Sequence, residues 1–286
     1  MKILISGASG LLGSALLRVG KFLDYDCRAF DRERITIGDP ASALQYFEDC
    51  EFFIHAAANT NVEYCELHPD VCYRDNLLLT DAFTAAAHKA NVPVVFISST
   101  GVYGAQKNTP YREYDETYPP THHHKSKKLA EDLVLRTNRS NLVVRTGWLF
   151  GGAKTSQKNF IANRIAEARG TSTGYIFSND QQRGCPTYAD DACIQIFNLL
   201  KLKHSGIFNI VNIGDASRFE YVSEIIALSG LEVKVQSQPA ASFNRVAPVS
   251  HNEMAVNWKA GEYNLPLMRP WREALAAYMN SSTFAN

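Results

Sequence analysis

Residues 121–131 read THHHKSKKLAE and bring together side chains that could transfer protons or bind a metal. His123, Lys127 and Glu131 follow one another at intervals of four, so they share one face if the stretch is helical. An imidazole can give or take a proton near neutral pH, because its ordinary pKa is about 6.5. The charge of Lys127 would lower the pKa of His123 and favour the neutral ring. By itself the stretch is compatible with proton transfer, with metal binding or with a charged surface run.

The three adjacent histidines are not typical of a metal site. Neighbouring residues of a helix point about 100° apart, so three in a row do not converge on one ion. No acidic residue or cysteine lies at ligand spacing. We therefore expect no bound metal, and we expect His122 and His124 to be polar residues of a pocket or of the surface.

The glycines of ILISGASGLLGSALL could bind a dinucleotide. Gly7, Gly10 and Gly13 follow an apolar strand pattern and open a helix pattern. A pyrophosphate needs a tight turn, close approach of the backbone and free N–H groups at a helix N-terminus, all of which this spacing supplies. The alternative is a turn that only packs the helix on the sheet.

Asp31 lies about 20 residues further on, where a carboxylate would bind the adenosine ribose of NAD. Arg32 and Arg34 follow it, and a guanidinium there could instead bind the 2′-phosphate of NADP. The cofactor is thus NADP or NAD, and a solvated charge run remains the alternative.

Composition narrows the class of protein. The chain has 286 residues, 29 basic and 29 acidic side chains and 45% hydrophobic residues, which predicts a folded protein without charge-driven nucleic-acid or membrane binding. No apolar run is long enough to span a bilayer, and Met1-Lys2 leads directly into ILISG without the features of a secretory signal. We expect a cytoplasmic protein whose six scattered cysteines are free thiols.

The elements that would position these residues alternate along the chain. Apolar runs at 3–6, 52–57, 94–99, 142–146, 175–178 and 207–211 are typical of buried parallel strands, and helix patterns at 69–90 and 125–137 lie between them. This predicts a doubly wound α/β fold of the Rossmann type. We expect an NAD(P)-binding domain at 1–150, completed by strands near 174–212, and a smaller interleaved substrate-binding lobe at 151–286.

Six stretches together resemble the extended short-chain dehydrogenase/reductase family, and within it the dTDP-4-dehydrorhamnose reductase branch. They are GASGLLG (7–13), HAAANTNVEYCE (55–66), YRDNLLLT (73–80), VVFISSTGVYG (94–104), VVRTGWLFG (143–151) and DQQRGCPTYADD (180–191). The resemblance implies cofactor contacts at Gly7, Gly10, Leu11, Leu12, Asp31, Arg32, Asp39, Ala56, Ala57, Ala58, Asn76 and Lys127. It implies substrate contacts at Thr60, Val62, Tyr103 and Trp148.

In that family a tyrosine gives the proton, a lysine four residues later lowers its pKa, and a serine or threonine hydrogen-bonds the substrate carbonyl. Lys127 matches the lysine, Ser99 matches the hydroxyl residue, and counting back four from Lys127 reaches His123. The histidine thus occupies the position of the catalytic tyrosine. Neither Tyr103, before Gly104, nor Tyr118, before two prolines, fits the register, although a loop could carry one of them into the pocket.

Each of these roles has a structural alternative. Ser99 could satisfy local backbone groups at a strand end, and Lys127 could be a solvated helix residue. Trp148 could belong to the core, and Thr60 and Val62 could be packing residues.

Near the C-terminus, NRVAPVSHNEMAVN at 244–257 departs from the family, which often has an Arg-Pro pair there. Ala247 precedes Pro248, and Arg245 lies two positions before Ala247. The second lobe could therefore take a different nucleotide sugar, or none.

Three functions follow from these observations. The first is an NAD(P)-dependent oxidoreductase that reduces the 4-keto group of a nucleotide-activated deoxysugar through an atypical His-x-x-x-Lys site. The second is a dinucleotide-binding regulatory subunit that has lost turnover, and the third is an NAD-dependent sugar epimerase. A nucleotide sugar is the expected small-molecule partner, and a homodimer is left open.

Overall fold

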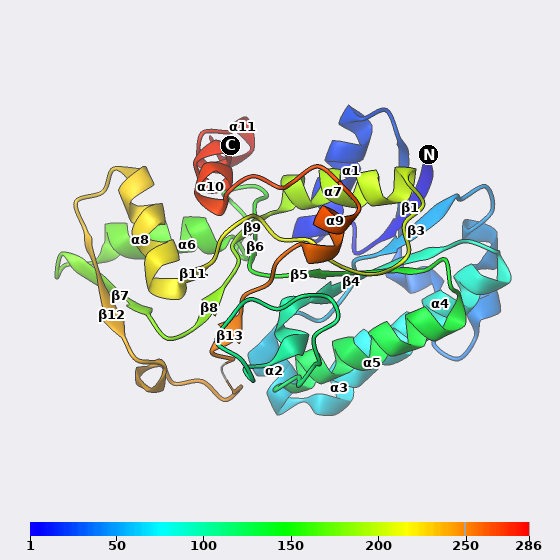
Figure 1. Cartoon of the computed structure of the whole chain (residues 1–286), viewed down its shortest axis with the longest axis horizontal. Coiled ribbons are helices and arrows are strands. Elements are labelled where there is room, and N and C mark those ends of the chain that lie inside the picture. Colours follow the sequence, from blue (N-terminus) through cyan, green and yellow to red (C-terminus); the bar gives the residue numbers. More distant parts are fainter. Residues whose placement is uncertain (249, 286) are drawn as a thin grey trace.

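The computed structural model describes residues 1–248 and 250–285, and a six-stranded parallel sheet lies at its centre (Figure 1). The strand order is β10-β5-β4-β3-β1-β2. The strands are β1 (Lys2–Ser6), β2 (Asp26–Phe30), β3 (Phe52–His55), β4 (Val94–Ser99), β5 (Leu142–Thr146) and β10 (Gly206–Asn209). The inner strands β4 and β5 are buried on both faces, which explains their near-continuous hydrophobicity, whereas the edge strand β2 is mostly exposed. The predicted doubly wound α/β fold is confirmed.

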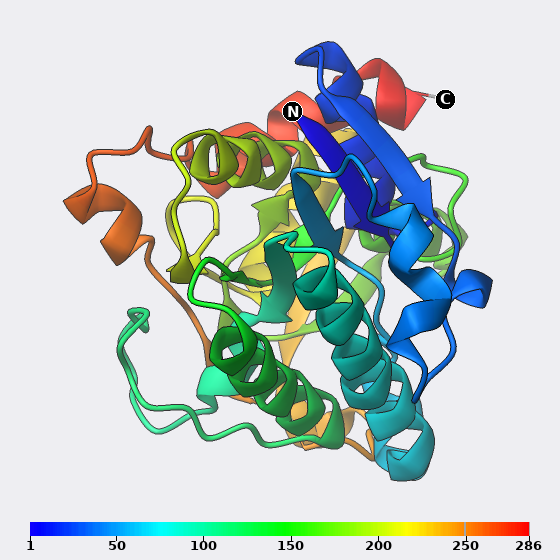
Figure 2. The same ribbon diagram turned by 90° about the vertical axis from the view of Figure 1, so that its right-hand side faces the viewer.

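Helices cover both faces of this sheet (Figures 1 and 2). On one face lie α1 (Leu11–Phe22) and α7 (Ala189–Lys201), and on the other lie α4 (Leu79–Lys89) and α5 (His122–Thr137). Alternate residues of β1 contact different layers, since Ile3 and Ile5 pack in the cluster under α1 and α7 whereas Leu4 packs in the cluster under α4.

The strand order creates a crevice at one end of the sheet. The chain passes from β1 to β2 on one side and returns to place β3 on the other side of β1. Such a reversal leaves a gap outside the carboxyl ends of the two strands, where ligands of doubly wound folds bind. The glycine turn follows β1, and residues Ala56–Ala58 follow β3, so both border this gap.

One long helix passes beside this crevice and contains a π-helical turn. It runs through α3 (Pro69–Tyr73), the π-helical residues Arg74–Leu78 and α4. The predicted helix at 69–90 therefore exists, but with a widened turn around Asn76 that the sequence pattern does not reveal. Such turns are frequent at functional sites. The short helix α2 (Val62–Leu67) precedes it, and 3₁₀ segments occur at Arg32–Arg34, Pro40–Tyr46, Thr100–Tyr103 and Ala240–Ser242.

A smaller lobe lies at the left of Figure 1. It contains α6 (Phe160–Gly170) and α8 (Arg218–Ser229), which pack on a two-stranded sheet of β7 (Tyr175–Asn179) and β12 (Lys234–Gln238). The predicted strand at 175–178 thus forms, but it pairs with β12 and does not join the central sheet. Of the two predicted strands between 174 and 212, β10 is the one that joins the central sheet. How the chain divides into domains stays a prediction.

Short strands connect this lobe with the central sheet. A three-stranded sheet has the order β11 (Ala216–Ser217), β8 (Arg183–Gly184) and β13 (Asn252–Glu253), and β6 (Leu149–Phe150) pairs with β9 (Thr187–Tyr188). The remaining helices are α9 (Trp258–Glu262), α10 (Trp271–Met279) and α11 (Ser282–Ala285). An aromatic cluster that includes Phe150, Tyr221 and Trp271 fills the space between these elements.

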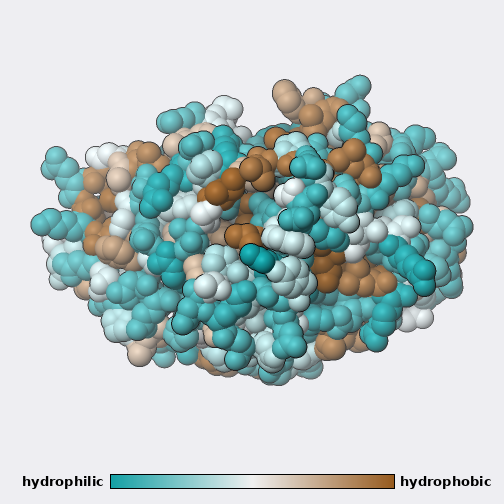
Figure 3. Space-filling view, viewed as in Figure 1, coloured by the Kyte–Doolittle hydropathy of each residue, from teal (hydrophilic) through white to brown (hydrophobic). Residues whose placement is uncertain are grey.

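The face drawn in Figure 3 is mainly hydrophilic, with hydrophobic residues in small separate groups. Among residues 1–248 and 250–285, no helix is long and apolar enough to cross a membrane.

Candidate active site

The glycine turn packs so tightly that side chains are excluded from it. Gly7 has a φ of +71°, and a Cβ on it would lie 2.6 Å from the backbone nitrogen of Ala57. A Cβ on Gly13 would lie 2.1 Å from the carbonyl oxygen of Gly7. No side chain caps α1, so its first N–H groups are free to bind an anion. These features fit a dinucleotide pyrophosphate.

The other predicted residues of the turn contribute differently. The side chain of Leu12 is buried in the core, so only its backbone could contact a cofactor, whereas Leu11 is half-buried. Ala56, Ala57 and Ala58 are half-buried after β3, on the far side of the crevice.

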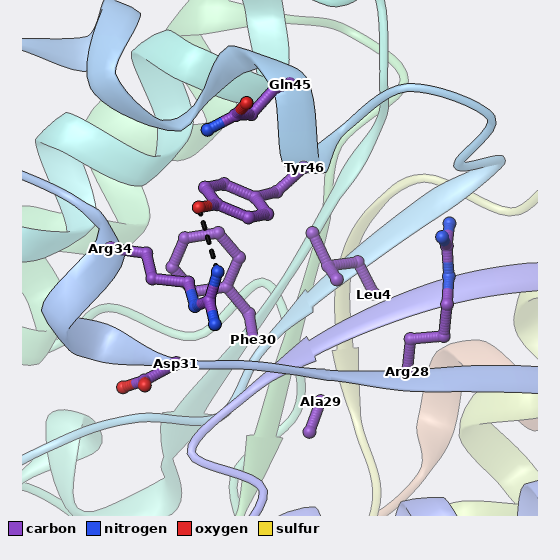
Figure 4. A pocket seen from close by; sticks show the side chains of 8 residues that line it. All are labelled: Leu4, Arg28, Ala29, Phe30, Asp31, Arg34, Gln45 and Tyr46. Atoms are coloured by element: carbon purple, nitrogen blue, oxygen red, sulfur yellow. Dashed lines mark hydrogen bonds between the residues drawn. The ribbon is translucent and has the colours of Figure 1, made fainter.

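Asp31, Arg32 and Arg34 follow β2 but have different partners. Asp31 accepts a hydrogen bond from the Glu33 N–H and caps the short 3₁₀ segment. Arg32 donates to Asp75 over 2.8 Å. Figure 4 shows Arg34 against the ring of Tyr46, to whose hydroxyl it donates over 3.0 Å, while the Asp31 carboxylate points away from both. All three side chains are exposed, so each can turn toward a ribose or a phosphate.

A cavity of about 340 Å³ lies beside Asp31 and Arg34, between β2 and the 3₁₀ segment Pro40–Tyr46 (Figure 4). Asp39, expected to contact the cofactor, lies at the start of that segment, where its carboxylate accepts a hydrogen bond from the Ala41 N–H. Asp39 is exposed and does not line the cavity.

A buried chain of hydrogen bonds joins β1, β3 and the π-helical turn. The hydroxyl of Ser6 lies 2.6 Å from Nδ1 of His55, and Nε2 of His55 lies 2.9 Å from the hydroxyl of Thr80. Thr80 donates to the carbonyl oxygen of Asn76 over 2.7 Å, so it must accept the proton from Nε2, and Ser6 must donate to Nδ1. Burial lowers the pKa of His55 to about 3, which keeps the ring neutral. This series of hydrogen bonds holds the π-helical turn against the sheet.

Asn76 connects this turn with the residues around His123. Its amide oxygen accepts from the Asn59 N–H over 2.7 Å, and its amide nitrogen donates to the Asn59 carbonyl and to the Ser126 hydroxyl over 3.1 Å each. Asn76 is therefore occupied in fixing the backbone after β3. The resemblance implies a cofactor contact for it, whereas these bonds indicate a positioning role.

His123 is buried, and its hydrogen bonds define its tautomer. Nδ1 lies 3.0 Å from the carbonyl oxygen of Asn59, which can only accept, so Nδ1 carries the hydrogen. The amide nitrogen of Asn76 lies farther away, at 3.4 Å, and its two hydrogens are directed to Asn59 and Ser126. Burial, His124 and Lys127 together lower the pKa of His123 to about 3. The ring is thus neutral at pH 7, and Nε2 presents a lone pair rather than a proton.

The three histidines occupy the first turn of α5, which Thr121 caps by accepting from the His124 N–H over 3.2 Å. The helix therefore begins at His122, three residues before the predicted start. His122 packs edge-on against Tyr73, while His124 contacts Thr121 and the backbone at Gly101. The imidazoles thus have different surroundings. Within the described residues no group of three or more His, Cys, Asp or Glu side chains could hold a metal ion.

Lys127 is buried beside β4 without an acidic partner. Its Nζ lies 3.9 Å from the centre of the Phe96 ring. The nearby Glu131 is instead bound by Arg145, at 2.7 and 2.9 Å, and by the Ser98 hydroxyl. Among residues 1–248 and 250–285, no carboxylate oxygen lies within 4.0 Å of Nζ. Burial lowers the pKa of Lys127 to about 7, although the charge of Glu131 raises it in part.

Ser99 lies at the carboxyl end of β4, half-buried. Its oxygen accepts from the Gly101 N–H over 3.1 Å, which leaves its own hydrogen free to donate to a ligand. Gly101 touches His124, since a Cβ on it would lie 2.1 Å from Nε2 of that ring. The structure thus brings the end of β4 against the start of α5.

Neither Tyr103 nor Tyr118 replaces the catalytic tyrosine that is absent at position 123. Tyr103, expected to contact substrate, is fully buried, stacks on Tyr111 and donates to Asn209 over 2.8 Å. Tyr118 is 49% exposed and donates to Glu116. The structure therefore corrects the expectation for Tyr103, whose hydroxyl is directed into the protein because the loop after β4 folds back over β10.

The other predicted substrate contacts lie at the edges of the site. Thr60 is exposed in the loop after β3, and Val62 is the first, half-buried residue of α2. Trp148 is half-buried, and its indole N–H donates to Glu253 over 2.9 Å.

Sequence reasoning missed several residues of this region. Asn59, His55 and Ser126 act through the hydrogen bonds described above, and Arg218 and Glu253 contact Trp148 from the second lobe. Asn59 stands within a stretch that carries the resemblance, so its position could have been noticed. Arg218 and Glu253 follow no motif.

Comparisons with known proteins agree with the fold. The chain is 28% identical to the spore coat polysaccharide biosynthesis protein SpsK of Bacillus subtilis, over 99% of both chains. It superposes with a TM-score of 0.91 on a dTDP-4-dehydrorhamnose reductase from Clostridium acetobutylicum (27% identity, 98% of this chain and 99% of that chain). The TM-score is 0.90 for the Bacillus anthracis dTDP-4-dehydrorhamnose reductase in complex with NADP (25% identity, 98% of this chain and 99% of that chain). The model of the RmlD substrate binding domain family matches residues 1–284, and the chain belongs to that family.

Proposed function

We propose that the protein is an NAD(P)-dependent oxidoreductase that reduces a keto group on a nucleotide-activated deoxysugar. The proposal is carried by the glycine turn after β1 and Ser99 at the carboxyl end of β4, on one edge of the same parallel sheet, together with the Lys127 ammonium over Phe96 of β4. Relatives named dTDP-4-dehydrorhamnose reductase, one of them in complex with NADP, support it. A 4-keto group is the finer expectation, drawn from the same relatives.

Different residues of this chain would bind the cofactor and bind the substrate carbonyl. The glycine turn would hold the pyrophosphate, with Asp31 and the arginines after it near the ribose. A bound dinucleotide supplies the hydride. Ser99 would donate its free hydroxyl hydrogen to the carbonyl oxygen of the sugar, and that oxygen needs a proton once hydride arrives.

Lys127, rather than His123, is the side chain that holds this proton. The neutral tautomer of His123 directs its N–H to Asn59 and can offer only a lone pair elsewhere. Lys127 has three N–H donors and a pKa near the working pH, the condition for an efficient general acid. His123 would then position the sugar or an intervening water by accepting a hydrogen bond.

The proposal can be tested with purified protein. Oxidation of NADPH and NADH is followed in the presence of a panel of nucleotide 4-keto sugars. Consumption of reduced dinucleotide that depends on one of these sugars supports the proposal. Dinucleotide binding without turnover of any sugar in the panel would contradict it.

The rate of reduction is expected to fall as the pH rises through about 7. The reason is that burial lowers the pKa of Lys127 to about 7, so the ammonium form that gives the proton is lost above that pH. Measurement of kcat between pH 5.5 and 9 would show this decrease. A rate that stays constant over this range would show that Lys127 is not the proton donor.

His123→Tyr is expected to raise kcat by about 10- to 100-fold, because a phenol adds a donor where the neutral imidazole offers a lone pair. His123→Gln is the matched control, since it keeps a polar group of similar size without acid function. If His123→Gln abolished turnover while Lys127 variants did not, the imidazole would be the acid and the assignment to Lys127 would be wrong.

The neutral state of His123 also favours a second function. A site that binds dinucleotide but lacks an acid at position 123 is what a regulatory subunit without turnover would show. This alternative gains support if the natural protein turns over no sugar while His123→Tyr does. The cytoplasmic location, the homodimer and the choice between NAD and NADP stay predictions.

A further inference from the structure

Trp148 lies across the small three-stranded sheet in a strained conformation. Its φ is +44°, a left-handed backbone conformation that is strained for a non-glycine residue. The indole lies against Gly184 in the middle strand, where a Cβ would be 2.4 Å from Cε2. Its N–H donates to Glu253 of β13, which pairs with Gly184 on one side. The strand order therefore places Trp148 over the centre of this sheet.

Arg218 covers the same indole from the other edge of the sheet. It follows β11, which pairs with Gly184 on the side away from β13. Its guanidinium carbon lies 3.5 Å from the centre of the Trp148 ring, and its Nε donates to the side chain of Gln182 over 3.3 Å. Stacking and this hydrogen bond hold the guanidinium plane, while both terminal nitrogens keep their donors for other partners.

Among the arginines of this region that the structure describes, Arg218 differs in having no carboxylate partner. No carboxylate oxygen of residues 1–248 or 250–285 lies within 4.0 Å of its nitrogens. Its neighbours are ion-paired: Arg183 with Asp215 and Glu220, and Arg245 with Glu63. The pKa of Arg218 is lowered by burial to about 10, so it remains charged at neutral pH. A held, half-buried cation without an ion-pair partner among the described residues is suited to bind an anion from outside the chain, although Glu253 lies on the same indole.

This cation borders the same region as the histidines of α5. Gly147, next to Trp148, touches Thr100, since a Cβ on it would lie 2.3 Å from the Thr100 hydroxyl oxygen, and the following residue Gly101 touches His124. His124 in turn packs against His123, with ring centres 5.1 Å apart. Trp148, with Glu253 and Arg218 on it, therefore lies beside the segment that follows Ser99 at the end of β4.

We propose that Arg218, held on Trp148, binds an anionic group of the substrate through its two terminal nitrogens. The ligand chemistry is an oxyanion with two neighbouring oxygens, either a carboxylate on the sugar or a phosphate of the nucleotide carrier. The inference rests on the proposed function and adds to it a substrate feature, a negative charge beside Trp148.

Binding measurements distinguish the two sources without turnover. Titration calorimetry is performed with UDP, UDP-glucose and UDP-glucuronate on the natural protein, on Arg218→Met and on Arg218→Lys. Arg272→Met is the matched control, because Arg272 also stacks on a tryptophan, at 4.4 Å, but is exposed and paired with Glu224. NADPH binding and circular dichroism show whether each variant is folded.

Arg218→Met is expected to weaken binding by about 10- to 100-fold, which is the effect of losing hydrogen bonds to a charged group. A loss confined to UDP-glucuronate identifies a carboxylate on the sugar, whereas an equal loss for all three ligands identifies the phosphates. Arg218→Lys should lose part of the affinity, since it keeps the charge without the planar fork.

Equal affinity of the natural protein and a folded Arg218→Met for all three ligands would overturn the inference and leave the proposed function intact. If the natural protein bound NADPH but none of the three ligands, the inference would be overturned, while the proposed function would still be decided by the panel of nucleotide 4-keto sugars. An equal loss in Arg272→Met would also overturn the inference, because a general charge effect would then explain the result.

Discussion

Lys127→Met is expected to lower kcat by about 10²- to 10⁴-fold, the usual contribution of a general acid. The ammonium is buried, has no carboxylate within reach among the described residues, and lies over Phe96 beside the end of β4. Methionine keeps much of the volume but holds no proton. Single-turnover measurements of NADPH oxidation would separate this loss from slow product release.

Lys125→Met is the matched control, because Lys125 lies two residues earlier on α5 and is exposed. It should retain the natural kcat. The folded state of Lys127→Met should be at least as stable as the natural protein, since the variant removes a buried charge. A Lys127→Met protein that kept its kcat would exclude Lys127 as proton source and as an essential part of the site.

Arg145→Met is expected to lower the free energy of unfolding by about 3–5 kcal/mol. Arg145 is 2% exposed and forms two hydrogen bonds with Glu131, which is fully buried, so the variant leaves a carboxylate in the core without its counter-charge. The guanidinium also lies 4.7 Å from the centre of the Tyr103 ring. Urea denaturation followed by circular dichroism measures the loss.

The double variant Arg145→Met/Glu131→Leu keeps this prediction testable if the single variant does not fold. Removing both charges should restore much of the stability, because no unpaired charge remains. Arg272→Met, which breaks an exposed pair, should cost less than about 1 kcal/mol. A loss of similar size in Arg145→Met and Arg272→Met would show that burial does not decide the strength of the inner pair.

The fold and the position of the site could be predicted from local patterns. The glycines at 7, 10 and 13, the buried strand runs and the spacing of Ser99, His123 and Lys127 are local features with a direct physical meaning. The predicted helix at 125–137 begins earlier because Thr121 provides a cap, and the predicted helix at 69–90 contains a π-helical turn. Both differences depend on hydrogen bonds that hydrophobic periodicity does not encode.

The roles of single residues in the site depended on contacts between distant segments. Tyr103 is in a motif of the predicted site, yet its hydroxyl bonds Asn209, 106 residues later. Arg218 is in no motif, yet it lies on Trp148, 70 residues earlier. Sequence spacing does not reveal such pairs, because the pairing of β8 with β11 and β13 brings them together.

The amino-acid sequence by itself determined the alternation of strands and helices, the glycine turn and the presence of His123 four residues before Lys127, because these follow from local spacing and backbone sterics. Only the tertiary structure decided the chemical state of those two residues. The carbonyl of Asn59, held by Asn76, directs the N–H of His123, and Glu131 is paired with Arg145, so that Lys127 has no ion-pair partner among the described residues. Proton affinity depends on burial and neighbouring charges, and these exist only once the distant segments have packed together.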